Sequence, residues 1–205
     1  MPRSVEPFLE RVAAGTPTPG GGTVSAICGA LSAALSRMVA NLAVGKQGYE
    51  TVQPDLAMIE ERGKALQRKF LDLAVEDSAA YDAVVVAMRL PKATEADRAV
   101  RKDAMQSAYT RATEVPMETV RACVEAFEIS RLASEKGNRG AITDVGVAAL
   151  LAEAAMRGAA LNVRVNLAAV AHPRWRDAME QELRTLLQRG AELSHVVNAL
   201  VESRM

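Results

Sequence analysis

Apolar residues recur along most of the chain at the three- and four-residue spacing of an α-helix, and no window alternates convincingly with the two-residue period of a strand. Glycine and proline mark the breaks between helical segments. The pattern predicts helices over residues 5–14, 23–44, 54–90, 95–136, 143 or 144 to 171, and 173–203. Long helices joined by short turns bury their apolar faces most readily in an antiparallel bundle, so we expect one all-α domain, residues 1–205.

The fourth predicted helix has recognisable signals at both ends and in its middle. Thr94 and Asp97 have the spacing of a capping box at its start. Pro116 is expected to kink it, because proline has no backbone N–H. Gly137 is expected to end it in the left-handed conformation.

Residues 23–45 form a nearly uncharged segment whose length would allow it to cross a bilayer. Arg37 and Asn41 would lie well inside such a span, so we expect a central or interface helix and no membrane partner. A stripe of small residues follows one side of this helix: Ser25, Gly29, Ser32 and Ser36. Such a stripe allows close approach of another helix, either in the same chain or in a second subunit.

The charge balance bears on possible partners. The chain has 25 Lys and Arg against 25 Asp and Glu, spread along its length, which disfavours binding to nucleic acid or to an anionic membrane. Two cysteines are too few for a disulfide scaffold, and no stretch resembles a secretion signal, so we expect the cytoplasm. The two histidines have no third ligand at metal spacing, so no metal site is expected.

Asp77 is a carboxylate on the apolar side of the third predicted helix. The side chains within about 40° of it on a helical wheel are apolar: Ile59, Leu66, Phe70, Leu73, Val84 and Met88. Burying an unpaired carboxylate is costly, so Asp77 is expected either to line a cleft or to pair with a residue such as Arg37. Tyr81 lies one turn further on the same side.

Two amides of the fifth predicted helix also point inward. Asn162 and Asn166 lie about 180° and 220° from Glu153, which marks the solvated face. Buried amides need partners for both donors and acceptors. A flat heterocyclic ligand would provide them, and so would a hydrogen-bond network between helices.

Two glycine-containing loops are further candidates for ligand contact. Residues 16–22, TPTPGGG, lack the spacing and lysine of a P-loop, but Gly20, Gly21 and Gly22 would leave backbone N–H groups exposed at a helix N-terminus, or simply form a tight turn. Residues 137–140, GNRG, precede Asp144, while two lysines stand just beyond helix ends. These are Lys46 and Lys92, and either could line a cleft mouth or be a solvated cap.

These same segments resemble the cyclodeaminase/cyclohydrolase family. The resemblance lies in TPTPGGG with MVANLAVGK at 38–46, DSAAYDAV at 77–84 with LPK at 90–92, and GNRGAITDVGV at 137–147 with ALNVRVN at 160–166. It covers nearly the whole chain in the same order. The family's lysine-rich stretch is reduced here to KQG at 46–48, and its SDAGV reads TDVGV, which retains Asp144.

The resemblance implies an all-helical protein that dimerises and acts on one-carbon units of tetrahydrofolate, with folate sites near the subunit interface. Together with the helix geometry, it suggests Asp77 as acid and base, assisted by Tyr81 or Lys46. The implied ligand contacts are Gly20, Gly21, Gly22, Lys92, Asn138, Asp144, Asn162 and Asn166. No tightly bound cofactor is implied.

Three functions remain open from the sequence. Methenyltetrahydrofolate cyclohydrolase is favoured, because no formiminotransferase portion accompanies these segments. Formimidoyltetrahydrofolate cyclodeaminase shares the same motifs. A non-catalytic helical dimer that scaffolds partners would instead use the inward polar groups for structure.

Overall fold

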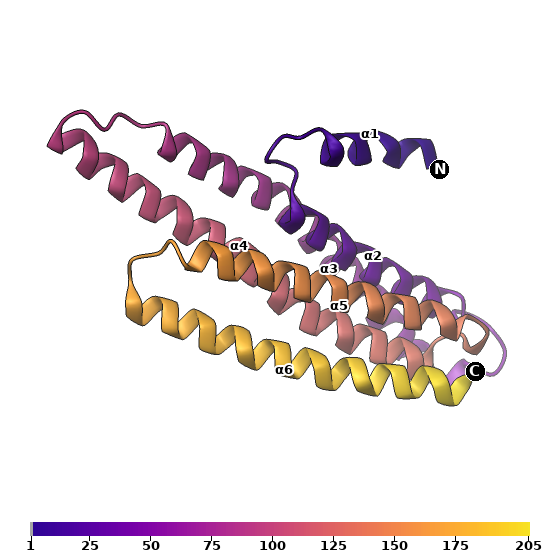
Figure 1. The fold of residues 1–205 in the computed structure, drawn as a ribbon. Helices are drawn as coiled ribbons and strands as arrows, with labels where there is room; N and C mark the ends of the chain where they lie inside the picture. Colours follow the sequence, from indigo (N-terminus) through magenta and orange to yellow (C-terminus); the bar gives the residue numbers. More distant parts are fainter. Residues whose placement is uncertain (1) are drawn as a thin grey trace.

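The computed structural model describes the backbone of residues 2–205 and the side chains from residue 4 onward. Helices account for most of these residues (Figure 1). The helices are α1 (Pro2–Ala13), α2 (Gly21–Asn41), α3 (Gln53–Met88), α4 (Glu95–Lys136), α5 (Ile142–Leu167) and α6 (Pro173–Arg204). Short 3₁₀ turns, η1 (Glu50–Val52) and η2 (Arg139–Ala141), precede α3 and α5. No strand occurs within the described residues, which confirms the all-α prediction.

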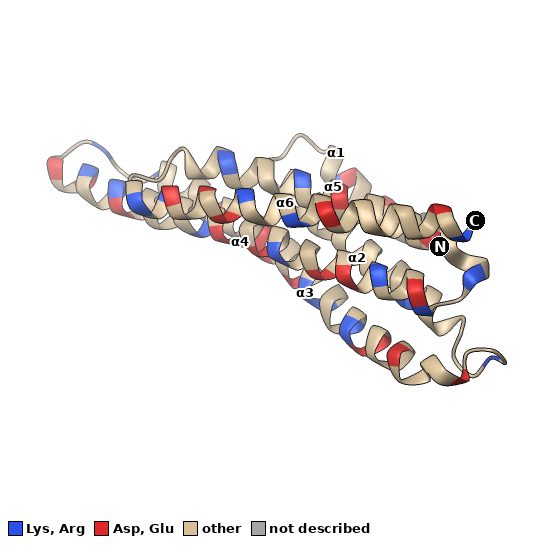
Figure 2. Cartoon of the chain, turned by 90° about the horizontal axis from the view of Figure 1, so that it is seen from below, with Lys and Arg blue, Asp and Glu red and all other residues tan. Residues whose placement is uncertain are grey.

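Four helices form the centre of the bundle. Helix α2 packs against α3 and α5, and α4 packs against the same two helices from the opposite side. Helix α6 covers α4 and α5, while α1 stands apart from the bundle (Figure 1). The paired ends of α3 and α4 extend past the other helices, so the α3–α4 turn lies at a protruding tip. Basic and acidic residues are interspersed along the helices (Figure 2).

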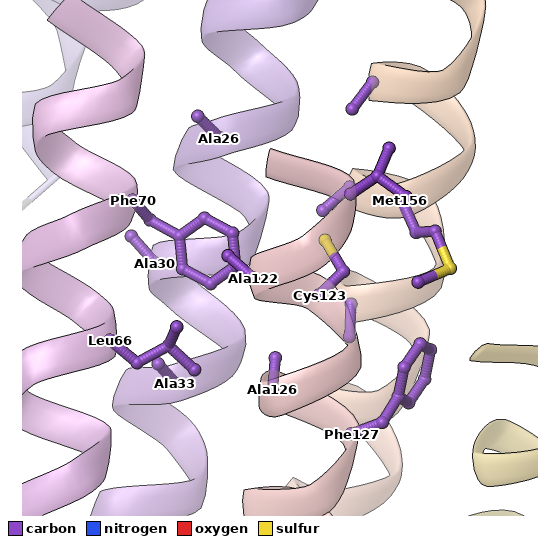
Figure 3. Close-up of a cluster of buried hydrophobic side chains, with 14 of the residues drawn as sticks. Ala26, Ala30, Ala33, Leu66, Phe70, Ala122, Cys123, Ala126, Phe127 and Met156 are labelled. Atoms are coloured by element: carbon purple, nitrogen blue, oxygen red, sulfur yellow. The ribbon is translucent and has the colours of Figure 1, made fainter. Parts of the chain in front are cut away.

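The small-residue stripe of α2 faces its own chain. Ser25, Ser32 and Ser36 are buried, and the Ser36 hydroxyl lies 3.0 Å from that of Ser130 on α4. A Cβ atom on Gly29 would collide with the Phe70 ring of α3. Figure 3 shows this ring packed among the alanines of α2 and α4. Of the two alternatives for the stripe, the structure therefore shows packing within the chain.

Helix α2 is long and apolar enough to cross a membrane by length and composition, with a mean hydropathy of 1.4. It is the one such helix among the described residues. Within its most apolar window, 56% of the residues are buried inside the bundle. That burial is the packing expected of a central helix.

Some predicted helix ends differ from those observed. The capping box is present, with the Thr94 hydroxyl accepting from the Asp97 N–H at 3.0 Å. Gly137, however, is extended, with φ −76° and ψ −177°, so the left-handed prediction was wrong. The physical need for glycine there is space, because a Cβ would lie 2.8 Å from Val39 Cγ1. Helix α5 also ends at Leu167, earlier than expected.

Candidate active site

A small cavity lies where the loop before α2 meets α3, α4 and α5. Its volume is about 110 Å³. Seven residues proposed from the sequence line it: Gly20, Gly21, Gly22, Asp77, Tyr81, Asn162 and Asn166. The cavity thus gathers side chains from helices far apart in the sequence around the N-terminus of α2.

Asp77 is half-buried beside this cavity, and its carboxylate touches the first turn of α2. The Thr23 hydroxyl donates a hydrogen bond to Asp77 Oδ2 at 2.9 Å. The same hydroxyl lies 3.0 Å from Ser78 Oγ, so Ser78 can donate to the Thr23 oxygen while Thr23 donates to Asp77. Burial raises the pKa of Asp77 above its ordinary value, and the hydroxyl and backbone N–H of Thr23 lower it by less.

The arginine considered as a partner of Asp77 is engaged elsewhere. Arg37 Nε and Nη2 donate to Glu60 of α3 at 2.9 and 2.5 Å, and Nη1 donates to Gln67 Oε1 at 2.5 Å. Among the described residues, no lysine, arginine or histidine forms an ion pair with Asp77. Asp77 is therefore a carboxylate without a cationic partner that lies next to a cavity.

The two inward amides of α5 each use their NH₂ group on a backbone carbonyl. Asn162 Nδ2 donates to the Gly158 oxygen at 2.9 Å, and Asn166 Nδ2 donates to the Ala112 oxygen of α4 at 2.7 Å. Within the described part of the chain, no group donates to either Oδ1 atom. The amides thus have structural partners and also keep an acceptor available to a ligand.

Comparisons with known proteins identify the family. Residues 4–185 match the family model described as formiminotransferase-cyclodeaminase. The chain belongs to this family. It is 39% identical over 202 residues to a methenyltetrahydrofolate cyclohydrolase from Methylorubrum extorquens, covering 98% of this chain and 97% of that protein.

Two further comparisons relate this family member to cyclodeaminases. It is 29% identical over 197 residues to a formimidoyltransferase-cyclodeaminase from Gallus gallus, of which it spans 36%. The solved structure of formiminotetrahydrofolate cyclodeaminase from Thermotoga maritima superimposes with a TM-score of 0.86 at 31% identity. That match covers 96% of this chain and 94% of the other, so the whole bundle is shared.

Four residues suggested by the family resemblance lie away from the cavity in this chain. Asn138 Nδ2 donates to the Leu42 oxygen at 2.8 Å, which places it at the C-terminal end of α2. Lys46 and Asp144 lie at the same end, after α2 and in the first turn of α5. The 21 residues of α2 span about 30 Å, so these side chains cannot reach the cavity of the same chain.

Lys92 is separated from the cavity in a different direction. It lies in the turn between α3 and α4, at the protruding tip of the bundle. The part of α3 between Asp77 and its end at Met88 is about 16 Å long. Lys92 therefore lies too far along the chain beyond Asp77 to reach the cavity, because the rest of α3 lies between them.

The cavity also contains residues that sequence reasoning missed. Thr18, Ala112 and Val165 line it, and Thr23 contacts Asp77. The Thr18 hydroxyl donates to Asp82 Oδ1 at 2.9 Å and so holds the glycine loop against α3. The sequence offered no signal for Thr23, because its contact with Asp77 joins residues 54 positions apart.

A larger groove of about 500 Å³ lies between α4, α5 and α6. Its one carboxylate, Glu153, pairs with Arg157 at 2.7 Å and accepts from the Ser194 hydroxyl at 3.4 Å. His195 lines the same groove. Because its acid is already paired with a cation, we place the candidate active site at the smaller cavity, where the carboxylate has no cationic partner.

Proposed function

We propose that this protein is a methenyltetrahydrofolate cyclohydrolase, which interconverts 5,10-methenyltetrahydrofolate and 10-formyltetrahydrofolate. The observation that carries the proposal is the half-buried Asp77 carboxylate, which lies on a cavity and has no cationic partner among the described residues. The substrate has a delocalised positive charge across its one-carbon bridge. A carboxylate in a partly desolvated site stabilises such a charge more strongly than it would in water.

In the hydrolytic direction, Asp77 acts as the general base. Water attacks the bridging carbon, and Asp77 accepts the proton that the water loses. The bond from this carbon to N5 then breaks, and N5 keeps the electron pair and takes up a proton. The hydroxyl loses its proton as the carbonyl forms, so the carbon remains on N10 as a formyl group and one proton is released overall. Burial raises the pKa of Asp77, which makes it a stronger base than an exposed aspartate once it is ionised.

The remaining cavity groups would orient the pterin ring. Asn162 and Asn166 each keep an Oδ1 acceptor to which no described residue donates, which matches the ring N–H and amino groups of a reduced pterin. Tyr81, which is 39% exposed and lines the cavity, would assist proton transfer. This reaction uses water, substrate and side chains, so the proposal includes no tightly bound cofactor. We place the reaction in the cytoplasm.

The proposal also includes a homodimer. The chain exposes large apolar side chains on the adjacent helices α2 and α5, among them Leu31 (50%), Leu161 (67%) and Val165 (67%). Large exposed apolar patches are rare on monomeric proteins, and Val165 also lines the cavity. A second copy on this face would complete a site that is too small, at about 110 Å³, for a whole folate.

A two-fold axis across the middle of α2 would run the two copies of this helix in opposite directions. The end of one chain that contains Lys46, Asn138 and Asp144 would then lie beside the cavity of the other. This arrangement accounts for the distance of Lys46, Asn138 and Asp144 from Asp77 within one chain, since one site would draw residues from both chains.

The experiment is a pair of assays on the purified protein. We expect it to consume 5,10-methenyltetrahydrofolate, followed as loss of the near-ultraviolet absorbance of that compound. The alternative function is formimidoyltetrahydrofolate cyclodeaminase, and the TM-score of 0.86 with the Thermotoga maritima enzyme supports it. An enzyme of that kind would release ammonia from the formimino substrate. Ammonia release without hydrolysis would support this alternative, and no reaction in either assay would contradict both and favour a scaffold.

A further inference from the structure

Pro116 lies inside α4, where proline removes a hydrogen bond. In an α-helix, the N–H of each residue donates to the carbonyl four positions earlier. Proline has no N–H, so the carbonyl of Ala112 has no donor from its own helix. Ala112 is only 4% exposed, and a buried carbonyl left without a partner is unfavourable.

Asn166 of α5 supplies the missing donor. Its Nδ2 lies 2.7 Å from the Ala112 oxygen. A carbonyl oxygen can only accept, so the atom that faces it must be the NH₂ group of the amide. The orientation of the Asn166 side chain is therefore determined, and its Oδ1 is the atom left to accept from another group.

This pair belongs to the candidate active site, because Ala112 and Asn166 both line the cavity beside Asp77. The neighbouring Asn162 is oriented in the same way by the Gly158 carbonyl of its own helix, at 2.9 Å. For Asn166, by contrast, the acceptor comes from a different helix and is free only because residue 116 is proline.

We propose that Pro116 is a positioning residue that fixes the Asn166 amide so that it presents an acceptor to the N–H groups of the bound pterin. The inference rests on the proposed function, which places a reduced pterin in this cavity. With any residue other than proline at position 116, a backbone N–H would compete for the Ala112 carbonyl. The Asn166 amide would then be free to rotate and could present NH₂ to a ligand that itself donates.

The test is a double-mutant cycle of Pro116→Ala and Asn166→Ala, with Pro7→Ala in the separate helix α1 as the control for removing a helical proline. Thermal unfolding is the first readout. We expect Asn166→Ala to lower Tm in the wild-type background, because the Ala112 carbonyl loses its donor. In the Pro116→Ala background the loss should be small, because the restored N–H takes over.

The second readout is the Kd of 5-formyltetrahydrofolate, a stable reduced folate, measured by calorimetry. We expect Pro116→Ala to raise this Kd about tenfold, which is the effect of losing one well-placed hydrogen bond between the pterin and Asn166. Pro7→Ala should leave the Kd unchanged. An equal Tm loss in both backgrounds, or an unchanged Kd in Pro116→Ala, would overturn the inference. Neither readout depends on turnover, so a failure of the cyclohydrolase proposal would be seen separately in the activity assays.

Discussion

The Asp77 carboxylate of α3 occupies the space where a side chain of Gly22 would lie, at the first turn of α2. This contact, together with the hydrogen bond from Thr23, holds the acid at the edge of the cavity. Glycine at position 22 thus allows close approach of the acid, which gives this part of the glycine run a role that does not involve a nucleotide.

Gly22→Ala should displace Asp77 and lower kcat/KM for methenyltetrahydrofolate by roughly 100-fold, because small misplacements of a catalytic group have effects of this size. The matched control is Gly146→Ala on α5, where the new Cβ would lie 3.5 Å from Val201 Cγ1, an ordinary contact. Steady-state kinetics with circular dichroism would check this. Normal kinetics in a folded Gly22→Ala protein would contradict the placement of Asp77.

Asp77→Asn should lower kcat by roughly 10²–10⁴-fold, because the amide has nearly the same shape but cannot accept the proton of the attacking water. Asp72→Asn, on the exposed side of the same helix, should retain activity. The measurement is initial rate at saturating substrate. If the folded Asp77→Asn variant turned over at the normal rate, Asp77 would not be the general base.

The same substitution should raise the thermal stability at neutral pH. Burial raises the pKa of Asp77, so the folded protein holds this proton more tightly than the unfolded chain does. Ionised Asp77 therefore destabilises the folded protein, and this effect grows as pH rises from the pKa of Asp77 in the unfolded chain to its pKa in the folded protein. We expect Asp77→Asn to raise Tm at neutral pH and the gain to shrink in acid, as measured by differential scanning calorimetry.

Thr23→Val should move the acidic limb of the kcat/KM pH profile to higher pH. The Thr23 hydroxyl lowers the pKa of Asp77, so without it the carboxyl is protonated at a higher pH and the base is lost earlier as pH falls. Thr23→Ser keeps the donor and should retain the wild-type limb. Identical profiles for the valine and serine variants would show that this hydrogen bond does not tune Asp77.

Mixing two inactive variants tests whether one site draws residues from both chains. The Asp77 carboxylate lies beside the start of α2, and Lys46 lies beyond its end. In the proposed dimer, a pair made of one Asp77→Asn chain and one Lys46→Ala chain therefore contains one site with neither substitution. Random reassociation should restore about a quarter of the wild-type activity. Ultracentrifugation would establish the dimer itself, and a mixture that stays inactive despite exchange would rule out the shared site.

The helical wheel was sufficient to find Asp77, Asn162 and Asn166, because the side of a helix on which a residue lies depends only on local geometry. It was not sufficient to find the partner of Asn166. The acceptor of Asn166 is a carbonyl 54 positions away, and no local pattern connects the two. The small-residue stripe of α2 was ambiguous for the same reason, since its neighbours come from other helices.

By itself the sequence determined the helices and their inward polar groups, since periodicity and breaks are local properties of the chain. Tertiary structure alone decided which of those groups meet. Asp77 and the glycine loop come together because α3 packs beside the start of α2, whereas Lys46 and Asn138 lie at its far end. Distance between helices depends on their order and direction in the bundle, and residue spacing along the chain does not contain that information.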